Sequence, residues 1–416
     1  MRLFLNIRTL YFALVLCGGL AAYSCKDGGR KSDAGDPTEP RFLKIDSLGI
    51  GSWRLVSVSP FDGSADTLVV DRPLERLILM STSHVGFLEA IGRPDVIAGV
   101  SSPDYLYSEP LPLSQGTSVS EEHATLGNVR GGTGAERSEA SGGAERSEAS
   151  EPPRVPWETK PVDVGYDSAP DYEKIVALKP DLLLAYSVSA AKSPFLERLD
   201  QLGIRVFIVS EHLESHPLAR AAYIRLFGAL TGNMETADSV LSVVTENYTT
   251  LAEAVANSAE RPRKVLMNIP YNDQWFVPSK ENYLNCLVED SGGTLLGTGS
   301  GKASSSVMSL EKAYSYSKEA DLWLNTGWCQ TMAQLLSVSP LFEDMVGNIR
   351  KNAAGAGFGE GPVAWNDNKR LSPKGGNDIW QSGVVRPDLV LRDLVSIMHP
   401  GLVIETEETV YYRALE

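Results

Sequence analysis

The chain has 416 residues, a length that suggests two or three domain-sized units. Its 53 acidic residues outnumber its 38 lysines and arginines, and the resulting net charge of −15 argues against a nucleic-acid-binding protein, which needs clustered cations to meet phosphates. Hydrophobic residues make up 43% of the chain, an ordinary globular composition, and four cysteines are too few for a disulfide framework.

The first 24 residues are typical of a secretory signal peptide. Arg2 and Arg8 precede a short apolar run over 10–22, and small residues lead from it to Cys25. This stretch resembles a bacterial lipobox, which predicts that Cys25 is lipidated; secretion without a lipid is the alternative. Residues 25–41 are rich in Gly, Pro and charge, and we expect a lipidated tether there. The protein would then be anchored by lipid to a membrane, on the periplasmic side of the cell envelope.

Two short apolar segments predict an N-terminal β-hairpin within residues 42–72. From residue 73 to 232, apolar runs alternate with helical patterns, which favours an α/β lobe with a parallel sheet. Its predicted strands lie over 76–80, 96–100, 182–185 and 206–209. Residues 116–160 interrupt this pattern with GAERSEASG, repeated as GAERSEASE, and we expect a disordered insertion there.

A long amphipathic linker helix is predicted over 233–258, because apolar residues recur at spacings of three and four from Ala237 to Val255. About 25 residues at ~1.5 Å each give a rod of roughly 36 Å, enough to join two lobes. Residues 262–416 show a second α/β pattern, with strands over 264–269 and 322–325. The sequence therefore predicts an α/β protein of two Rossmann-like lobes with parallel sheets, joined by a long rigid helix, with a ligand cleft between the lobes.

The sequence contains no complete catalytic motif of the kinds considered below. The glycine-rich run over 297–302 lacks the first glycine and the final Ser or Thr of a phosphate loop, and the sequence contains no GxSxG elbow. His212 and His216 are not in an HExxH arrangement; a metal site would need further ligands such as His84 and Glu211. We therefore expect neither an enzyme nor a resident metal, and pairing of Cys286 with Cys329 stays open.

Aromatic residues follow several predicted strands, where open parallel sheets bind their ligands. Rings from both lobes would wall a cleft suited to a bulky ligand, although packing within its own lobe is the alternative for each ring. Arg370, close in sequence to the last of these rings, would contact an anionic ligand. The candidate ligand-binding rings are Tyr105, Tyr166, Tyr186, Trp275, Trp328 and Trp365.

The chain as a whole resembles the cobalamin and ferric-siderophore periplasmic binding proteins of ABC importers. The resemblance runs from about residue 75 to 399 apart from the insertion, and includes RLILMSTSHVGFLEAIGRPDVIAGV, APDYEKIVALKPDLLLAY and VVRPDLVLRDLVSIMHP. It implies a substrate-binding lipoprotein that captures an iron chelate (siderophore or haem) or cobalamin and delivers it to a permease and its ATPase. The chelate or corrinoid would be its ligand, not a cofactor, and we expect a monomer.

The resemblance also implies that one glutamate at the start of a helix in each lobe docks onto arginines of the permease. These residues are Glu173, where Pro170 marks a helix start, and Glu311, where Ser309 is a predicted N-cap. Simple stabilisation of the helix dipole is the alternative role. Two other functions stay open: a free metal-ion (zinc or manganese) receptor of the same fold, and a surface capture lipoprotein without its own permease.

Overall fold

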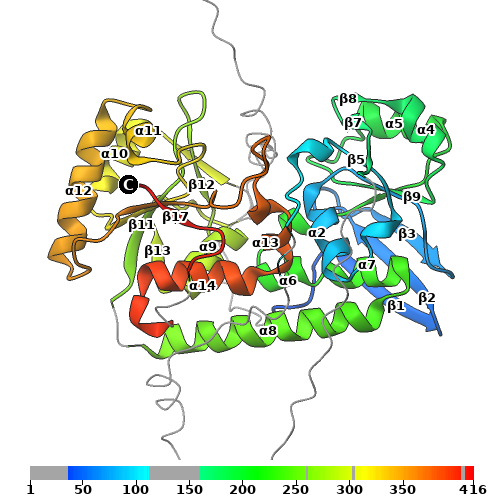
Figure 1. Cartoon of the computed structure of the whole chain (residues 1–416), viewed down its shortest axis with the longest axis horizontal. Coiled ribbons are helices and arrows are strands. Elements are labelled where there is room, and N and C mark those ends of the chain that lie inside the picture. The colour runs from blue at the N-terminus through cyan, green and yellow to red at the C-terminus, as the bar shows by residue number, and fades with distance from the viewer. Residues whose placement is uncertain (1–35, 110, 112–159, 259–260, 302–304, 404–407) are drawn as a thin grey trace, which may run out of the picture.

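The computed structural model describes residues 36–109, 111, 160–258, 261–301, 305–403 and 408–416. The predicted signal peptide, Cys25 and nearly all of the predicted insertion lie outside these residues. The described chain forms two α/β lobes that stand on one long helix, α8 (Met234–Asn257) (Figure 1). In the described part of the chain, no helix is both long enough and apolar enough to cross a membrane.

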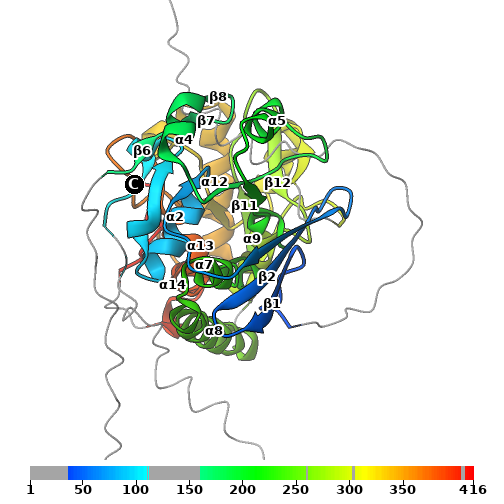
Figure 2. The same ribbon diagram turned by 90° about the vertical axis from the view of Figure 1, so that its right-hand side faces the viewer.

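The N-terminal segment forms a three-stranded antiparallel sheet, where the sequence predicts only a hairpin. Its strands are β1 (Leu43–Gly49), β2 (Ser52–Val58) and β3 (Ala65–Val70), in that order. β1 is missed because it is an edge strand with mostly exposed residues, so its apolar pattern is weak. The sheet lies beside helix α7 (Ile224–Thr231) (Figure 2), and Ser57 Oγ donates to the Ile208 carbonyl at 2.6 Å.

The N-terminal lobe contains a parallel five-stranded sheet of order β10-β9-β4-β5-β6. Its central strand consists of Leu77, Ile78 and Leu79, all with 0% exposure, as expected for a strand covered on both faces. The strands are β4 (Leu77–Leu79), β5 (Ile97–Val100), β6 (Val162–Asp163), β9 (Leu182–Ala185) and β10 (Val206–Ile208). The helices are α2 (Thr82–Ala90), α4 (Tyr172–Leu178), α5 (Pro194–Gln201) and α6 (Pro217–Ala221), and a small ribbon pairs β7 (Gly165–Tyr166) with β8 (Ala169–Pro170).

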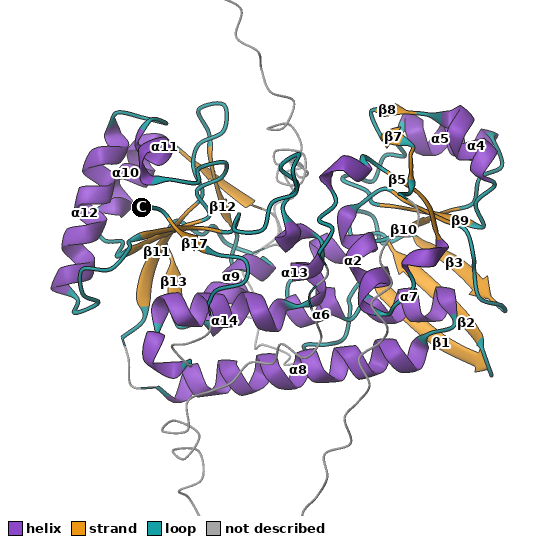
Figure 3. Cartoon of the chain, in the orientation of Figure 1, coloured by secondary structure: helices purple, strands orange, loops and turns teal. Residues whose placement is uncertain are grey.

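The C-terminal lobe has a second five-stranded sheet of order β13-β11-β15-β16-β17, parallel except for its last strand. Helices lie around this sheet (Figure 3), so both lobes confirm the predicted α/β class. The strands are β11 (Arg263–Met267), β13 (Gly293–Leu295), β15 (Leu322–Leu324), β16 (Ala364–Asn366) and β17 (Arg413–Ala414), with a ribbon of β12 (Trp275–Pro278) and β14 (Ser305–Met308). The helices are α9 (Tyr283–Asp290), α10 (Leu310–Ser317), α11 (Met332–Leu336), α12 (Leu341–Gly355), α13 (Ser382–Val385) and α14 (Pro387–Met398).

Helix α8 spans both lobes over 24 residues. One face of it is buried, through Ala237, Val240, Val244, Tyr248, Leu251 and Val255. This face packs against α7 of the N-terminal lobe and against α14, which runs above α8 in Figure 1. The C-terminal chain thus returns to the middle of the molecule, where α13 packs against α2.

Candidate functional site at the seam between the lobes

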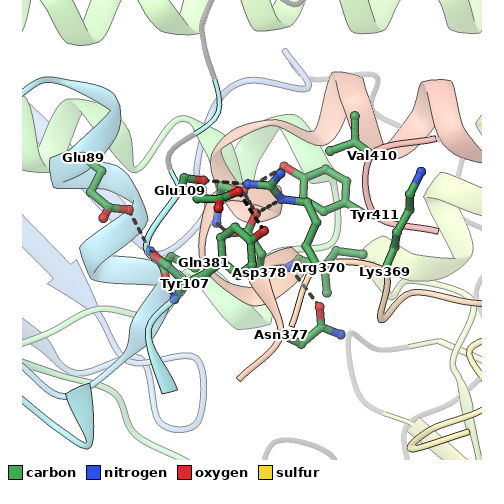
Figure 4. A network of polar contacts seen from close by, with 12 residues as sticks. Glu89, Tyr107, Glu109, Lys369, Arg370, Asn377, Asp378, Gln381, Val410 and Tyr411 are labelled. Carbon is green, nitrogen blue, oxygen red and sulfur yellow. Dashed lines mark hydrogen bonds and ion pairs between the residues drawn. The ribbon is translucent and has the colours of Figure 1, made fainter. Parts of the chain in front are cut away.

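A segment of the C-terminal lobe, residues 367–381, reaches the N-terminal lobe at residues 104–109 (Figure 4). The Arg370 guanidinium donates to the Glu109 carbonyl at 2.6 Å, and it lies 4.3 Å from the centre of the Tyr107 ring. Its Nε pairs with the Asp378 carboxylate at 2.6 Å. Arg370 thus contacts the N-terminal lobe and a buried acid of its own segment, and its contact with an anionic ligand stays a prediction.

A second residue of this segment also crosses the seam. The Gln381 side chain donates to Glu89 Oε2 at 2.8 Å and accepts from the Tyr107 N–H at 3.0 Å. Below it, Gly86 of α2 lies so close to Gln381 that a Cβ added there would be 2.2 Å from the Gln381 carbonyl oxygen. We call residues 104–109 together with 367–381 the bridge.

Buried polar side chains of the N-terminal lobe lie where strands end. Ser83 Oγ donates to Glu211 Oε1 at 2.7 Å, and both residues are buried. Burial opposes the charge on Glu211, but its interactions with the neighbouring His212 and Arg220 outweigh that cost and lower the pKa of Glu211 to about 2. Burial lowers the pKa of His84 to about 4, so this imidazole is neutral at pH 7.

His84 and His212 both approach Glu211 Oε2, at 3.9 and 3.8 Å. Even so, the ligand atoms of these three residues are not among the described groups that lie mutually within 4.8 Å, as a metal site requires. The structure therefore does not favour them as one metal centre.

A small cavity of about 20 Å³ lies beneath the bridge, lined by residues of both lobes. The Arg220 guanidinium sits 3.9 Å from the centre of the Tyr283 ring at this cavity. Asp367 also lines it, and its Oδ2 has no hydrogen-bond partner among the described residues. Burial raises the pKa of Asp367 to about 7. The cavity is large enough for one water molecule and far too small for a drug-sized ligand.

The sequence did not predict the buried polar residues around this cavity. One signal was available: a polar residue directly follows buried strands, as Asn268 follows β11, Asn325 follows β15 and Asp367 follows β16. Asn268 and Asn325 adopt positive φ angles of 70° and 56°, which asparagine tolerates better than most residues. Such residues are compatible with the sharp change of direction at a strand end.

The six predicted ring residues do not form one wall. Trp275 is a correction: it has 0% exposure, stacks on Trp323 at 5.8 Å between ring centres, and donates to the Met267 carbonyl. It belongs to the core of the C-terminal lobe because its strand β12 is buried throughout. Trp365 lies in β16, and its indole donates to the Pro362 carbonyl.

The remaining rings fall into three places. Tyr105 and Tyr166 are neighbours in the N-terminal lobe, where Tyr105 contributes to raising the pKa of Tyr166 after burial does so. Tyr186 meets the His212 ring edge-on, at 6.0 Å between centres. Trp328 is 55% exposed, in a loop that Asn366 holds by donating to the Gly327 and Cys329 carbonyls. Of the predicted rings, the structure thus brings only Tyr105 and Tyr166 together, and it leaves the Trp328 ring exposed to solvent.

The two predicted docking glutamates occupy equivalent places in the lobes. Glu173 is exposed in the first turn of α4, and Glu311 is exposed in the first turn of α10. Helix α4 begins just after Pro170, as predicted, and Asp171 caps it, because the Asp171 side chain accepts from the Lys174 N–H at 3.0 Å. Ser309 is confirmed as the cap of α10, where it accepts from the Lys312 N–H. Hydrogen bonding by Ser309 lowers the pKa of Glu311, which keeps it charged. Figure 1 shows α4 and α10 at the upper ends of the two lobes, away from α8.

Two parallel-sheet lobes that meet at a seam above a connecting helix define a two-lobed solute-binding protein. The chain belongs to the periplasmic binding protein family, whose match covers residues 138–346, half of the chain. This is a family of solute-binding proteins, which work with ABC permeases, and not of enzymes. Membership places the chain in the cell envelope.

Individual relatives are distant. A curated lipoprotein of Methanocaldococcus jannaschii, described as uncharacterized, is 24% identical over 343 residues, which cover 80% of this chain and 67% of the relative. A periplasmic binding protein from Veillonella parvula has a similar fold, with a TM-score of 0.52 at 14% identity, over 85% of this chain and 99% of that one. A Staphylococcus epidermidis protein, described as a possible iron-binding periplasmic solute-binding protein, gives 0.51 at 16% identity, over 78% of this chain and 98% of that one.

Proposed function

We propose that this chain is the lipid-anchored substrate-binding subunit of an ABC importer, which captures an iron chelate (siderophore or haem) or cobalamin and delivers it to the permease. The observation that carries the proposal is the placement of Glu173 and Glu311. Each is an exposed carboxylate in the first turn of a helix, one in each lobe, on the side away from α8. Exposed carboxylates that meet arginines orient a partner and speed its association more than they raise its affinity.

The ligand chemistry is supported by aromatic side chains that remain accessible. Trp328 is 55% exposed, and Tyr105, Tyr166, Tyr186 and Trp365 are partly exposed. Flat rings suit a corrinoid, a haem or an aromatic siderophore. The cavity of about 20 Å³ beneath the bridge cannot hold such a molecule, so the ligand would bind outside it. Because the rings lie in separate places, we assign Trp328, the most exposed of them, as the ring that contacts the ligand. The Staphylococcus epidermidis protein of similar fold is described as a possible iron-binding protein, which supports an iron chelate as the ligand.

The lipid anchor is proposed at Cys25. The sequence around it resembles a lipobox, and the Methanocaldococcus jannaschii relative is described as a lipoprotein. Incorporation of a radiolabelled fatty acid by wild-type protein, and its loss in Cys25→Ala, tests this step separately from ligand capture.

Charge reversal tests the docking role. Glu173→Arg and Glu311→Arg should abolish ligand uptake by cells and leave ligand binding by the purified protein unchanged. Glu235→Arg is the matched control, because Glu235 is also an exposed first-turn acid but lies on α8. Uptake that survives both reversals would contradict the docking role and would favour a surface capture lipoprotein without its own permease.

A further inference from the structure

A group of metal-ligating side chains lies where helices α6, α8 and α9 meet. His216 immediately precedes α6, and Cys286 and Asp290 lie on α9. One ligand atom from each of these three residues lies within 4.8 Å of the other two. Cys286 and Asp290 are four residues apart, so they share one face of α9.

Hydrogen bonds connect Asp290 of this cluster to Cys286 and to Tyr248. Cys286 Sγ donates to Asp290 Oδ2 at 3.3 Å, and the Tyr248 hydroxyl of α8 donates to the same oxygen at 2.5 Å. The His216 ring lies 5.8 Å from the Tyr248 ring, and its Nδ1 accepts from the Leu218 N–H at 3.1 Å. None of His216, Cys286 and Asp290 is fully buried.

We propose that His216, Cys286 and Asp290 form a binding site for a divalent cation of the Zn²⁺ type. Thiolate, imidazole and carboxylate are the side chains that bind Zn²⁺, and three protein ligands leave a fourth position for water or the Tyr248 oxygen. Zn²⁺ bonds of about 2.0–2.3 Å place tetrahedral ligand atoms roughly 3.3–3.8 Å apart, so the cluster needs to contract only slightly.

Binding changes the protonation of the cluster. Cys286 binds as a thiolate, and its proton leaves to solvent. A neutral imidazole ligand carries a proton on its other nitrogen, so His216 no longer accepts the Leu218 N–H once the ion is bound. The ion thus replaces one capping hydrogen bond at the start of α6 with a metal–ligand bond.

The placement of the cluster gives the ion a structural consequence. His216 belongs to the N-terminal lobe, and Cys286 and Asp290 belong to the C-terminal lobe. A cation held by all three would cross-link the lobes beside α8, so its binding should stabilise the folded protein. This inference is independent of the proposed chelate, and a negative result here would leave that proposal standing.

Co²⁺ and Zn²⁺ titrations of the purified full-length chain test the site. We expect one equivalent of Co²⁺ to produce thiolate-to-cobalt charge-transfer absorption, Zn²⁺ to displace it, and Zn²⁺ to raise the thermal midpoint. Cys286→Ser should abolish the absorption, and Asp290→Asn and His216→Asn should each weaken Zn²⁺ binding at least tenfold. Cys329→Ala is the control, because Cys329 is buried elsewhere in the C-terminal lobe and should leave the absorption unchanged.

A second measurement needs no variant. Zn²⁺ should slow the alkylation of Cys286 by iodoacetamide in the wild-type protein, as followed by peptide mass spectrometry. The proposal is overturned if the wild-type protein gives no charge-transfer absorption, if the absorption persists in Cys286→Ser, or if Zn²⁺ leaves the alkylation rate of Cys286 unchanged.

Discussion

The guanidinium of Arg370 lies 4.3 Å from the centre of the Tyr107 ring, so a cation of the C-terminal segment rests on an aromatic ring of the N-terminal lobe. The same guanidinium pairs with Asp378, whose side chain is only 2% exposed. The lobes are therefore joined by the bridge, by the packing of α13 against α2, and by helix α8. These connections favour a modest closing motion over a wide hinge movement.

Arg370→Gln should destabilise the protein. It leaves the Asp378 carboxylate buried without its cation, and breaking such a pair costs roughly 3 kcal/mol. The free energy of unfolding in urea measures this loss. Arg205→Gln is the matched control: Arg205 pairs with Asp66, both side chains are more than 40% exposed, and the expected loss is below about 1 kcal/mol. Equal losses in the two variants would contradict a buried role for Arg370.

Gly86→Ala should disturb the contact between α2 and the bridge. The added methyl group would lie 2.2 Å from the Gln381 carbonyl oxygen, a backbone atom that cannot move alone, and such overpacking costs about 1–3 kcal/mol. Gly347→Ala provides the comparison. It lies inside α12 with no atom within 4 Å of the added carbon, so the protein should gain about 0.5–1 kcal/mol. Chemical denaturation of both variants checks the opposite signs.

Asp367 should make stability fall as pH rises. Its pKa is about 7 in the folded protein against 3.8 for an ordinary aspartate, so between these values the folded state holds a proton that the unfolded state has lost. The penalty is absent below about pH 4 and complete above about pH 7, where the shift corresponds to about 4 kcal/mol.

The test compares wild type with Asp367→Asn, which cannot ionise. The unfolding free energy of the variant should lack this fall between pH 4 and pH 8, and the difference between the two curves isolates Asp367 from His84 and other titrating groups. Parallel curves would show that the Asp367 carboxyl titrates normally.

Substitution by leucine should lower the stability of the protein at Trp275 and weaken ligand binding at Trp328. Trp275→Leu removes a buried ring that stacks on Trp323, with an expected loss of about 3 kcal/mol or more. Trp328→Leu should change stability by less than about 0.5 kcal/mol, because its ring is 55% exposed, and should instead weaken chelate binding. Thermal denaturation and ligand titration of both variants separate the two roles.

The sequence predicted the elements that have strong local patterns. Residues 77–80 and 182–185 are continuous apolar runs, and they contain the neighbouring parallel strands β4 and β9. The apolar stripe from Ala237 to Val255 is the buried face of α8. Such patterns are visible because each element must bury one face or both.

The bridge could not be predicted in the same way. Arg370 and Glu109 are 261 residues apart, and nothing near either residue indicates the other. Trp275 was misjudged because its position after a strand suggested a binding loop. The neighbouring Phe276 and Val277 form an apolar run with it, which was in fact the signal of another buried strand.

The most direct test of capture is a tryptophan-fluorescence titration of the purified protein with cobalamin, haem and several ferric siderophores, followed by mass analysis of the recovered ligand. We expect saturable quenching of the tryptophan fluorescence at one equivalent by one of these ligands, weaker in Trp328→Leu than in Arg205→Gln, with the ligand recovered unchanged. Absence of quenching by all of them, or recovery of a chemically altered ligand, would contradict the proposed function.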